Sequence, residues 1–265
     1  MKKPSLVVLL LILSLFLVSF PQIEEAKAQG TIYIRADGTV EGTDKIHQSG
    51  DIYRLTANIS EGIQIQKSSI VLDGEGFTLQ GNGEGRGIDL SNGRGQDPSR
   101  PEINNVTVKN LKILNFYYGI DNANTNNNTF YGNYIENCQS SLWIIGSLNN
   151  NITFNTLNNA SISINYSGSN IITKNNFINC WVTLWLSTPP IMDGNYWNNY
   201  NGTDNNGDGM GDTPYVIDEN NQDNYPLMEP VVIPEFPSWL ILPLFLVLAP
   251  IVVVIRNKIS HKSWI

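Results

Sequence analysis

The segment DNNGDGMGD at residues 204–212 has the spacing of a calcium-binding loop. In the pattern D-x-[DN]-x-[DN]-G, alternate residues direct oxygen atoms toward a hard cation. The ligand positions fall on Asp204, Asn206, Asp208, the backbone carbonyl of Met210, and Asp212. Tyr215 stands where a bidentate Glu is usual, so Asp218 or Glu219 would have to replace it. The segment predicts a Ca²⁺ site, and the alternative is an acidic, glycine-rich turn without metal.

Two carboxylates occupy equivalent places in the triplet GID, which occurs at residues 87–89 and again at 119–121. If Asp89 and Asp121 are neighbours on adjacent strands, they lie about 5 Å apart. Paired carboxylates cleave glycosidic bonds, one acting as the acid and the other as base or nucleophile. The stretch 104–200 contains no Arg or His to complete a lyase site. We therefore expect a solvated acidic pair without catalytic function, and the alternative is a polysaccharide hydrolase or lyase that uses both.

A third candidate site consists of aromatic and amide side chains on one face of a predicted strand. Aliphatic residues at matching positions of successive repeats predict a single inward column: Ile120, Leu142, Ile164 and Leu184. Because side chains alternate along a strand, the next residues should face outward: Asp121, Trp143, Asn165 and Trp185. Exposed indole rings stack on the apolar faces of sugars. The predicted carbohydrate contacts are thus Trp143, Asn165 and Trp185, and the alternative is tryptophan packed beneath a loop.

A sequence repeat must position all of these side chains. Its most regular members are two asparagine series: Asn115, Asn137, Asn159, Asn179 and Asn199, and Asn133, Asn155, Asn175 and Asn195. Their spacing of about 20 to 22 residues is typical of a solenoid. The repeats are rich in Ile, Ser, Thr and Asn and poor in helix-forming residues, which favours short β-strands. We therefore predict an all-β parallel β-helix rather than a leucine-rich repeat.

Asparagine suits the corners of such a fold because it tolerates the left-handed backbone region. Identical residues stacked about 4.8 Å apart also pass amide hydrogen bonds along the stack. A disordered asparagine-rich tract is the alternative, but it would lack the recurring aliphatic residues. The segment from Gly93 to Glu102 interrupts the repeat, and its Gly, Pro and charged residues predict a surface loop.

Longer stretches carry a resemblance to a known family: IRADGTVEGTDKI, SIVLDGEGFTLQG, the NNxTxxN repeats, and GNYWNNYNGTDNNGDGMGDTPYVIDENNQDNYPL. Across residues 31–228 the chain resembles the NosD-like right-handed β-helix proteins, which are abundant among archaeal surface proteins. The resemblance implies a right-handed parallel β-helix and a surface location better than it implies an activity. The family's namesake assists the maturation of a copper enzyme, and this accessory role is a further alternative. The 2 His of the chain offer no copper site, however.

Both ends of the chain predict export and anchoring. Residues 1–28 combine lysines, an apolar core and an Ala-x-Ala cleavage site, as a secretory signal peptide does. The apolar run 239–255 is long enough for a short membrane-spanning helix, and the basic tail 256–265 should remain inside the cell. The linker 231–238 resembles a PEF-type sorting signal read by an archaeosortase, and its matching residues are Pro234, Glu235 and Phe236.

The predicted body of the protein lies between these ends. It comprises a β-helix over residues 29–200 and a cap over 201–230 that contains the calcium-like segment. We expect both on the extracellular face of the cell membrane, held there by the C-terminal segment. The formal net charge of −8 argues against nucleic acid as a partner. Sequons for N-glycosylation begin at Asn58, Asn105, Asn127, Asn151, Asn159, Asn165 and Asn201.

An oxidising location would normally favour a disulfide between Cys138 and Cys180. The repeat argues otherwise, because both residues follow a closing asparagine and lie two turns apart. Two turns correspond to about 9.6 Å, beyond the reach of about 7 Å between the Cα atoms of a disulfide. We predict two packed thiols.

The function best matched by these features is that of a non-catalytic cell-surface protein that contacts carbohydrate or forms part of the envelope. Its expected partners are carbohydrate or envelope components, the membrane, and an archaeosortase-like processing enzyme.

Overall fold

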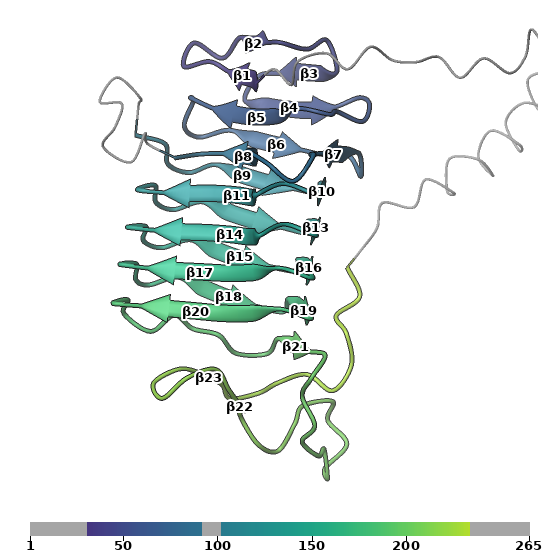
Figure 1. The fold of residues 1–265 in the computed structure, drawn as a ribbon, viewed down its shortest axis with the longest axis vertical. Helices are drawn as coiled ribbons and strands as arrows, with labels where there is room; N and C mark the ends of the chain where they lie inside the picture. Colours follow the sequence, from purple (N-terminus) through teal and green to yellow (C-terminus); the bar gives the residue numbers. More distant parts are fainter. Residues whose placement is uncertain (1–30, 92–101, 234–265) are drawn as a thin grey trace, which may run out of the picture. The chain divides into compact units, whose positions relative to one another are not determined.

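The computed structural model describes residues 31–91 and 102–233. In these residues, short parallel strands wind into about six turns of a β-solenoid whose rungs contain about 22 residues (Figure 1). The predicted all-β parallel solenoid is therefore confirmed. Each turn contributes one strand to each of three sheets, so that strands far apart in sequence become hydrogen-bonded neighbours.

The eight-stranded sheet carries the predicted acidic pair and the predicted carbohydrate contacts, whereas the calcium-like segment lies outside it. In spatial order it contains β2 (Val40–Glu41), β1 (Thr31–Ile34), β5 (Gly62–Ile65), β8 (Arg86–Asp89), β11 (Tyr118–Ala123), β14 (Ser140–Ile145), β17 (Ser161–Asn165) and β20 (Trp181–Trp185).

Two further sheets close the cross-section. The seven-stranded sheet contains β18 (Ile171–Thr173), β15 (Asn151–Thr153), β12 (Thr129–Tyr131), β9 (Thr107–Lys109), β6 (Val71–Asp73), β4 (Ile52–Leu55) and β3 (Ile46–Ser49). The six-stranded sheet contains β21 (Tyr196–Trp197), β19 (Asn176–Ile178), β16 (Thr156–Asn158), β13 (Tyr134–Glu136), β10 (Lys112–Leu114) and β7 (Thr78–Gln80). A separate hairpin pairs β22 (Tyr215–Val216) with β23 (Gln222–Asp223).

Asparagine forms the corners of the rungs as predicted. Of the first predicted series, four members have a left-handed backbone, with φ between 50° and 58°: Asn115, Asn137, Asn159 and Asn179. The second series is an internal ladder in which each side-chain amide donates to the next: Asn133 to Asn155 at 3.0 Å, Asn155 to Asn175 at 3.0 Å, and Asn175 to Asn195 at 3.1 Å. These amides are buried and hydrogen-bonded, so polar residues line the corner without an unpaired group.

The single inward column predicted for Ile120, Leu142, Ile164 and Leu184 is wrong in register. Ile120 does lie opposite Leu142, but Leu142 lies opposite Ile162. Ile164 instead pairs with Ile144 above it and Leu184 below it. The reason is a shortening of the rung from 22 to 20 residues at the corner before β17. Two parallel aliphatic columns result, and both face the core.

The two ends of the solenoid are closed differently. At the N-terminal end, antiparallel pairing of β1 with β2 and of β3 with β4 covers the first rung. At the other end, the Trp197 ring stacks on Tyr215 with centroids 4.3 Å apart. The buried Asp223 carboxylate ends the asparagine ladder by accepting hydrogen bonds from the Asn195 backbone at 2.8 Å and the Trp197 indole at 3.0 Å.

The two cysteines carry free thiols, which confirms the prediction that they do not form a disulfide. Several other predictions fall outside the described residues: the signal peptide at 1–28, most of the loop from Gly93 to Glu102, the motif Pro234, Glu235 and Phe236, and the apolar run 239–255. Within residues 31–91 and 102–233, no helix has the length and apolar character needed to cross a membrane.

Candidate functional site

The outer face of the eight-stranded sheet carries two distinct groups of side chains. The first, which we call the charged cluster, consists of Gln64, Arg86, Asp89, Ser91 and Asp121 on the upper rungs. The second, which we call the aromatic end, consists of Asn165, Tyr166, Trp181, Thr183 and Trp185 on the last two rungs. The side chains that were predicted to form one continuous surface are therefore split between these two groups.

Asp89 and Asp121 lie directly opposite each other on β8 and β11, as the two GID triplets predict. Asp89 accepts hydrogen bonds from the Gln64 amide at 3.1 Å and from the Ser91 backbone N–H at 2.9 Å and hydroxyl at 2.6 Å. Asp121 accepts a hydrogen bond from the guanidinium of Arg86 and forms an ion pair with it. Both carboxylates are thus held by neighbours.

The structure contradicts the expectation of a solvated acidic pair. Asp121 has no solvent-exposed surface and Asp89 is 8% exposed. A carboxylate that must protonate or attack a substrate needs to reach it within about 3 Å. Buried and hydrogen-bonded as they are, these two groups are placed to hold the strands together rather than to meet a polysaccharide.

Arg86 is the residue of this cluster that the sequence reasoning missed. It precedes the stretch 104–200 in which a basic partner was sought, and it reaches Asp121 from the previous rung. Gly87 lies against the core, since a Cβ on it would lie 2.6 Å from the Ile113 side chain. On either side of it, Arg86 forms the ion pair with Asp121 and Asp89 lies opposite Asp121 on the neighbouring strand. Arg86 and Asp121 are 35 positions apart in the sequence, so no pattern of neighbouring residues predicts this contact.

Trp143 belongs with the charged cluster and not with Trp185. It lies opposite Asp121 on one side and Ser163 on the other. Its ring is half-buried and packs against Tyr118, with centroids 5.1 Å apart. The predicted pairing of Trp143 with Trp185 in one column is therefore wrong, for the same shift of register at the corner before β17.

Trp185 retains the environment expected of a sugar contact. It is 57% exposed and lies opposite Asn165, as predicted. The Tyr166 ring packs edge-on against it, with centroids 4.9 Å apart and an interplanar angle of 73°. Exposed residues alternate along β20, so that Thr183 lies between Trp185 and Trp181, which is 59% exposed. Hydroxyl and amide groups thus lie among large exposed rings.

One left-handed turn position changes its residue type along the solenoid. In successive rungs it is occupied by Asn124, Gly146, Tyr166 and Leu186, all with φ between 49° and 60°. Asparagine and glycine adopt this left-handed conformation readily, whereas it costs other residues about 1–2 kcal/mol. Tyr166 and Leu186 nevertheless occupy it and are 53% and 66% exposed. Phe154 and Lys174 adopt the same conformation at another corner, with φ of 58° and 57°, so the exposed rings, rather than the backbone conformation alone, make the aromatic end the better candidate.

The calcium-like segment forms a compact turn around Asp204. Its carboxylate accepts backbone hydrogen bonds from Gly207 at 2.7 Å and Gly209 at 2.9 Å. Asp208 accepts from the backbone of Met210 at 2.9 Å and from the Asn206 amide at 3.0 Å. Asp212, the last predicted ligand, accepts instead from Asn205 at 2.6 Å.

These contacts shape the turn and hold the Asp204 and Asp208 carboxylates against its own backbone. No set of three His, Cys, Asp or Glu side chains in the described ranges gathers closely enough to hold a metal. A calcium ion here would therefore need the amide of Asn206 and a backbone carbonyl beside Asp204 and Asp208, as in the predicted ligand set.

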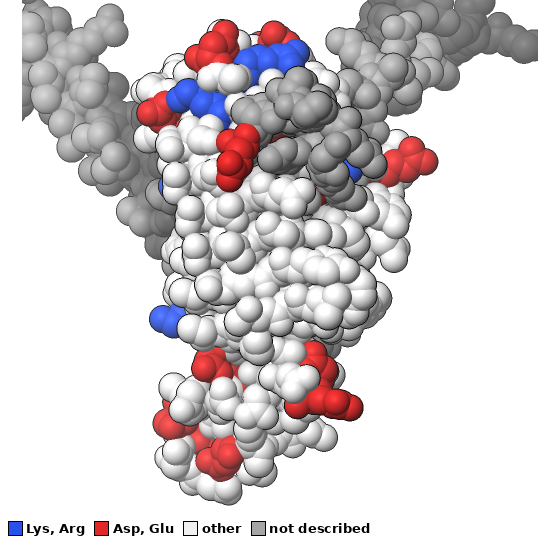
Figure 2. Space-filling model, turned by 90° about the vertical axis from the view of Figure 1, so that its left-hand side faces the viewer, with Lys and Arg blue, Asp and Glu red and all other residues white. Residues whose placement is uncertain are grey.

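Charge separates the two ends of the outer surface from its middle. Figure 2 shows acidic and basic side chains toward the first rungs, acidic ones toward the C-terminal cap, and a broad surface with few charges between them. The acidic C-terminal side chains include Asp204, Asp208, Asp212, Asp218 and Glu219.

Fold and site together define a parallel β-solenoid with an exposed aromatic cluster at one end. No family model and no curated protein matches the chain.

Proposed function

We propose that the protein is a non-catalytic surface module that contacts carbohydrate through its aromatic end. The observation that supports this proposal most directly is the exposed Trp185 with Tyr166 packed beside it, on a rigid sheet face. Aromatic rings bury the apolar faces of sugars, and nearby hydroxyl and amide groups supply hydrogen bonds to the sugar hydroxyls. Asn165 and Thr183 are the polar groups in position for this role.

The proposal extends to the setting of the module. The sequence resemblance supports a right-handed, NosD-like β-helix, and the predicted signal peptide and C-terminal span support a position outside the cell on the membrane. An envelope component without a bound sugar is the closest variant of this proposal. An archaeosortase-like enzyme would then process the tail at Pro234, Glu235 and Phe236.

A polysaccharide hydrolase or lyase is the second candidate, and Arg86 is the observation in its favour. Together with Asp89 and Asp121 it supplies a basic residue beside two carboxylates. Burial of both carboxylates weighs against this candidate. The copper-accessory role gains no further support, since His47 is the single histidine in the described part of the chain.

Binding of the purified full-length protein to a glycan array tests the main proposal. Trp185→Ala should weaken binding to any positive glycan by on the order of tenfold, the effect of losing one aromatic contact. Tyr225→Ala is the matched control, because Tyr225 is also 57% exposed but lies on the cap. Equal losses in the two variants, or no positive glycan at all, would reject the carbohydrate site.

A reducing-sugar assay on every glycan that binds separates module from enzyme. The module releases no product, whereas the catalytic alternative predicts product that disappears in Asp121→Asn. Release of sugar by the unmodified protein would replace the first proposal with the second.

A further inference from the structure

The C-terminal edge of the eight-stranded sheet differs from those of its two neighbours. Bridges continue the other sheets past their last full strands, Ile171 pairing with Ile191 and Tyr196 with Leu227. In the described residues, by contrast, the eight-stranded sheet ends at β20, with β17 on one side and no strand on the other. An edge strand of this kind presents unpaired backbone N–H and C=O groups, which pair readily with another extended chain.

The two aliphatic columns of the core also end at this edge. Ile162 and Ile164 in β17 are fully buried, with 0% exposure. Val182 and Leu184, one rung below them in β20, are only partly buried. Each aliphatic residue in the upper rungs is covered by the next strand of the sheet. In the residues that the structure describes, no further strand of this sheet covers Val182 and Leu184, because the sheet ends at β20.

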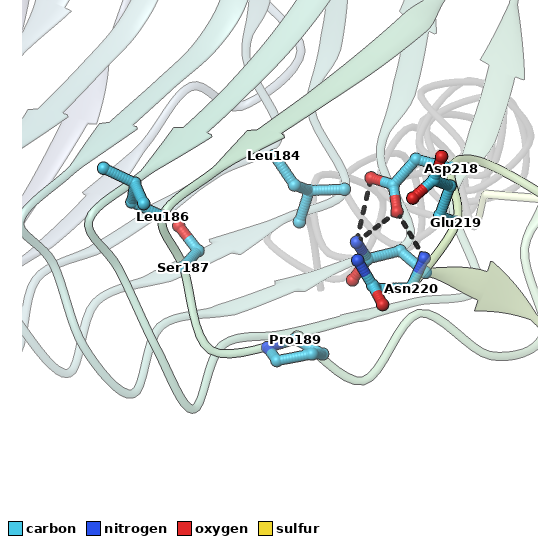
Figure 3. A pocket seen from close by; sticks show the side chains of 8 residues that line it. Leu184, Leu186, Ser187, Pro189, Asp218, Glu219 and Asn220 are labelled. Carbon is cyan, nitrogen blue, oxygen red and sulfur yellow. Dashed lines mark hydrogen bonds between the residues drawn. The ribbon is translucent and has the colours of Figure 1, made fainter.

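An open groove of about 660 Å³ lies at the C-terminal end of β20, which contributes Leu184 to its lining (Figure 3). Leu184, Leu186 and Pro189 form its apolar wall. Asp218 and Glu219, on the loop between β22 and β23, form the opposite wall. The Asn221 amide donates to the Asp218 carboxylate at 2.7 and 2.9 Å and fixes the loop in this position. The groove thus has one apolar and one acidic side.

We propose that this groove binds an extended peptide segment of another protein, which adds to β20 as the missing strand. The segment carries an aliphatic side chain toward Leu184 and a Lys or Arg toward Asp218 and Glu219. Main-chain hydrogen bonds to the sheet edge supply affinity, and the side chains in the groove supply specificity. The acidic wall selects a basic segment through charge complementarity.

Two other occupants fit less well. A second copy of the protein would bring its own cap and several further strands to β20, but the Asp218–Asn221 loop lies opposite Leu184 and Leu186 and leaves room for little more than one strand. A sugar would satisfy neither the backbone groups of β20 nor the exposed ends of the aliphatic columns. A single extended chain satisfies both and has the thickness of one strand.

Synthetic peptides test the proposal on the purified full-length protein. The probe is a fluorescent peptide Lys-Val-Ser-Val-Lys, and its controls replace both Lys by Glu or the central Ser by Pro. Binding measured by fluorescence anisotropy should be lost with Pro, which removes a backbone N–H. The Glu peptide should bind at least about fivefold more weakly, because it loses the ion pairs and brings like charges to the acidic wall.

Protein variants locate the site. Asp218→Asn with Glu219→Gln should weaken the Lys peptide about fivefold, whereas the charge-matched control Asp44→Asn with Glu84→Gln should not, since both residues are exposed on early rungs. Glu219→Gln alone should cause part of the loss and avoids the hydrogen bonds that Asp218 makes to the loop. Tyr166→Ala, which removes the ring packed against Trp185 and leaves β20 unchanged, should leave peptide binding intact and thereby separate this groove from the carbohydrate site.

Four results would overturn the proposal. These are equal binding of the Lys and Glu peptides, tolerance of the central Pro, equal losses in the two charge-matched double variants, and absence of binding. Concentration-dependent dimerisation that the peptide does not inhibit would assign the edge to a second copy. Displacement of the peptide by a soluble glycan would assign the groove to sugar.

Discussion

The charged cluster and the aromatic end occupy the same sheet face but use polar and aromatic residues in opposite ways. In the cluster, Asp121 and Asp89 are buried and bonded to neighbours, so they contribute to the folded state. At the aromatic end, Trp185 and Tyr166 are more than half exposed, and Tyr166 has an unfavourable backbone conformation. The comparison shows that a charged pair on a solenoid face is not a better functional candidate than an uncharged one, because burial decides which groups reach a ligand.

The largest effect should come from the core that supports both regions. Leu142 is 1% exposed and lies between Ile120 and Ile162, above the aromatic end and below the charged cluster. Leu142→Ala should lower the free energy of unfolding by about 2–5 kcal/mol, as buried truncations do. Chemical denaturation measures this change. A loss below about 1 kcal/mol would show that the register of the inner columns is wrong.

Calcium should stabilise the cap beneath the aromatic end. If Asp204, Asn206 and Asp208 bind the ion, a Ca²⁺ concentration of one hundred times Kd stabilises the fold by about 2.7 kcal/mol. Calorimetry with Ca²⁺ and with a chelator should show a higher Tm with the ion, and Asp208→Ala should abolish the difference. Asp44→Ala, an exposed acidic residue on an early rung, is the control. Identical Tm values in calcium and chelator would mean that the turn is closed by its own hydrogen bonds.

The charged cluster should be important for stability and dispensable for binding. Arg86→Leu removes a hydrogen bond to a buried carboxylate, and such bonds contribute about 1.5–3 kcal/mol. The unfolding free energy should fall by that amount, and glycan binding should stay at the level of the unmodified protein. If instead stability is kept and binding or product release is lost, the cluster is the functional site and the comparison is reversed.

Much of the scaffold could be predicted from the sequence, because its regularity is local. The asparagine corners recur at a fixed spacing, and asparagine is among the few residues that favour their backbone conformation. The opposition of Asp89 and Asp121 followed from a repeated triplet. The free thiols of Cys138 and Cys180 followed from the separation of two rungs.

The parts that escaped prediction depend on contacts between rungs. A two-residue shortening at one corner moved Ile164 and Trp185 out of the columns of Leu142 and Trp143, and the aliphatic pattern is the same in either register. Arg86 contacts Asp121 on the next rung, so no pattern of neighbouring residues in the sequence predicts the contact. The exposure of Trp185 reflects the absence of a following strand, which only the full topology reveals.

The two cysteines allow an inner rung to be compared with one near the end of the solenoid, because Cys138 is buried and Cys180 is partly buried. Burial raises the pKa of the Cys138 thiol to about 11, and it also raises the pKa of Cys180, which is only half-buried. The buried thiol stays protonated to a higher pH than the thiol of the unfolded chain. Its contribution to the unfolding free energy is therefore complete below pH 9 and is lost as the pH rises toward 11. The unfolding free energy should therefore fall by about 1 kcal/mol between pH 8 and pH 10. Cys138→Ala should reduce that fall, and an unchanged pH dependence would show that the thiol is not enclosed.

The smallest expected effect is an increase in the unfolding free energy, and it tests whether the last rungs are less stable than their sequence could make them. Leu186 is 66% exposed with φ at 49°, at the position where Asn124 stands in an upper rung. Because asparagine adopts this conformation with less strain, Leu186→Asn should stabilise the protein by about 0.5–1 kcal/mol.

The reverse substitution, Asn124→Leu, introduces the same strain into an upper rung and should destabilise the protein by a similar amount. Chemical denaturation of the two variants forms a matched test. If Leu186→Asn stabilises the protein and weakens the binding of a glycan or the Lys peptide, Leu186 lowers stability in favour of binding, as residues of binding surfaces do. If Leu186→Asn is destabilising, Leu186 contributes to the fold, and its backbone strain is not a cost of binding.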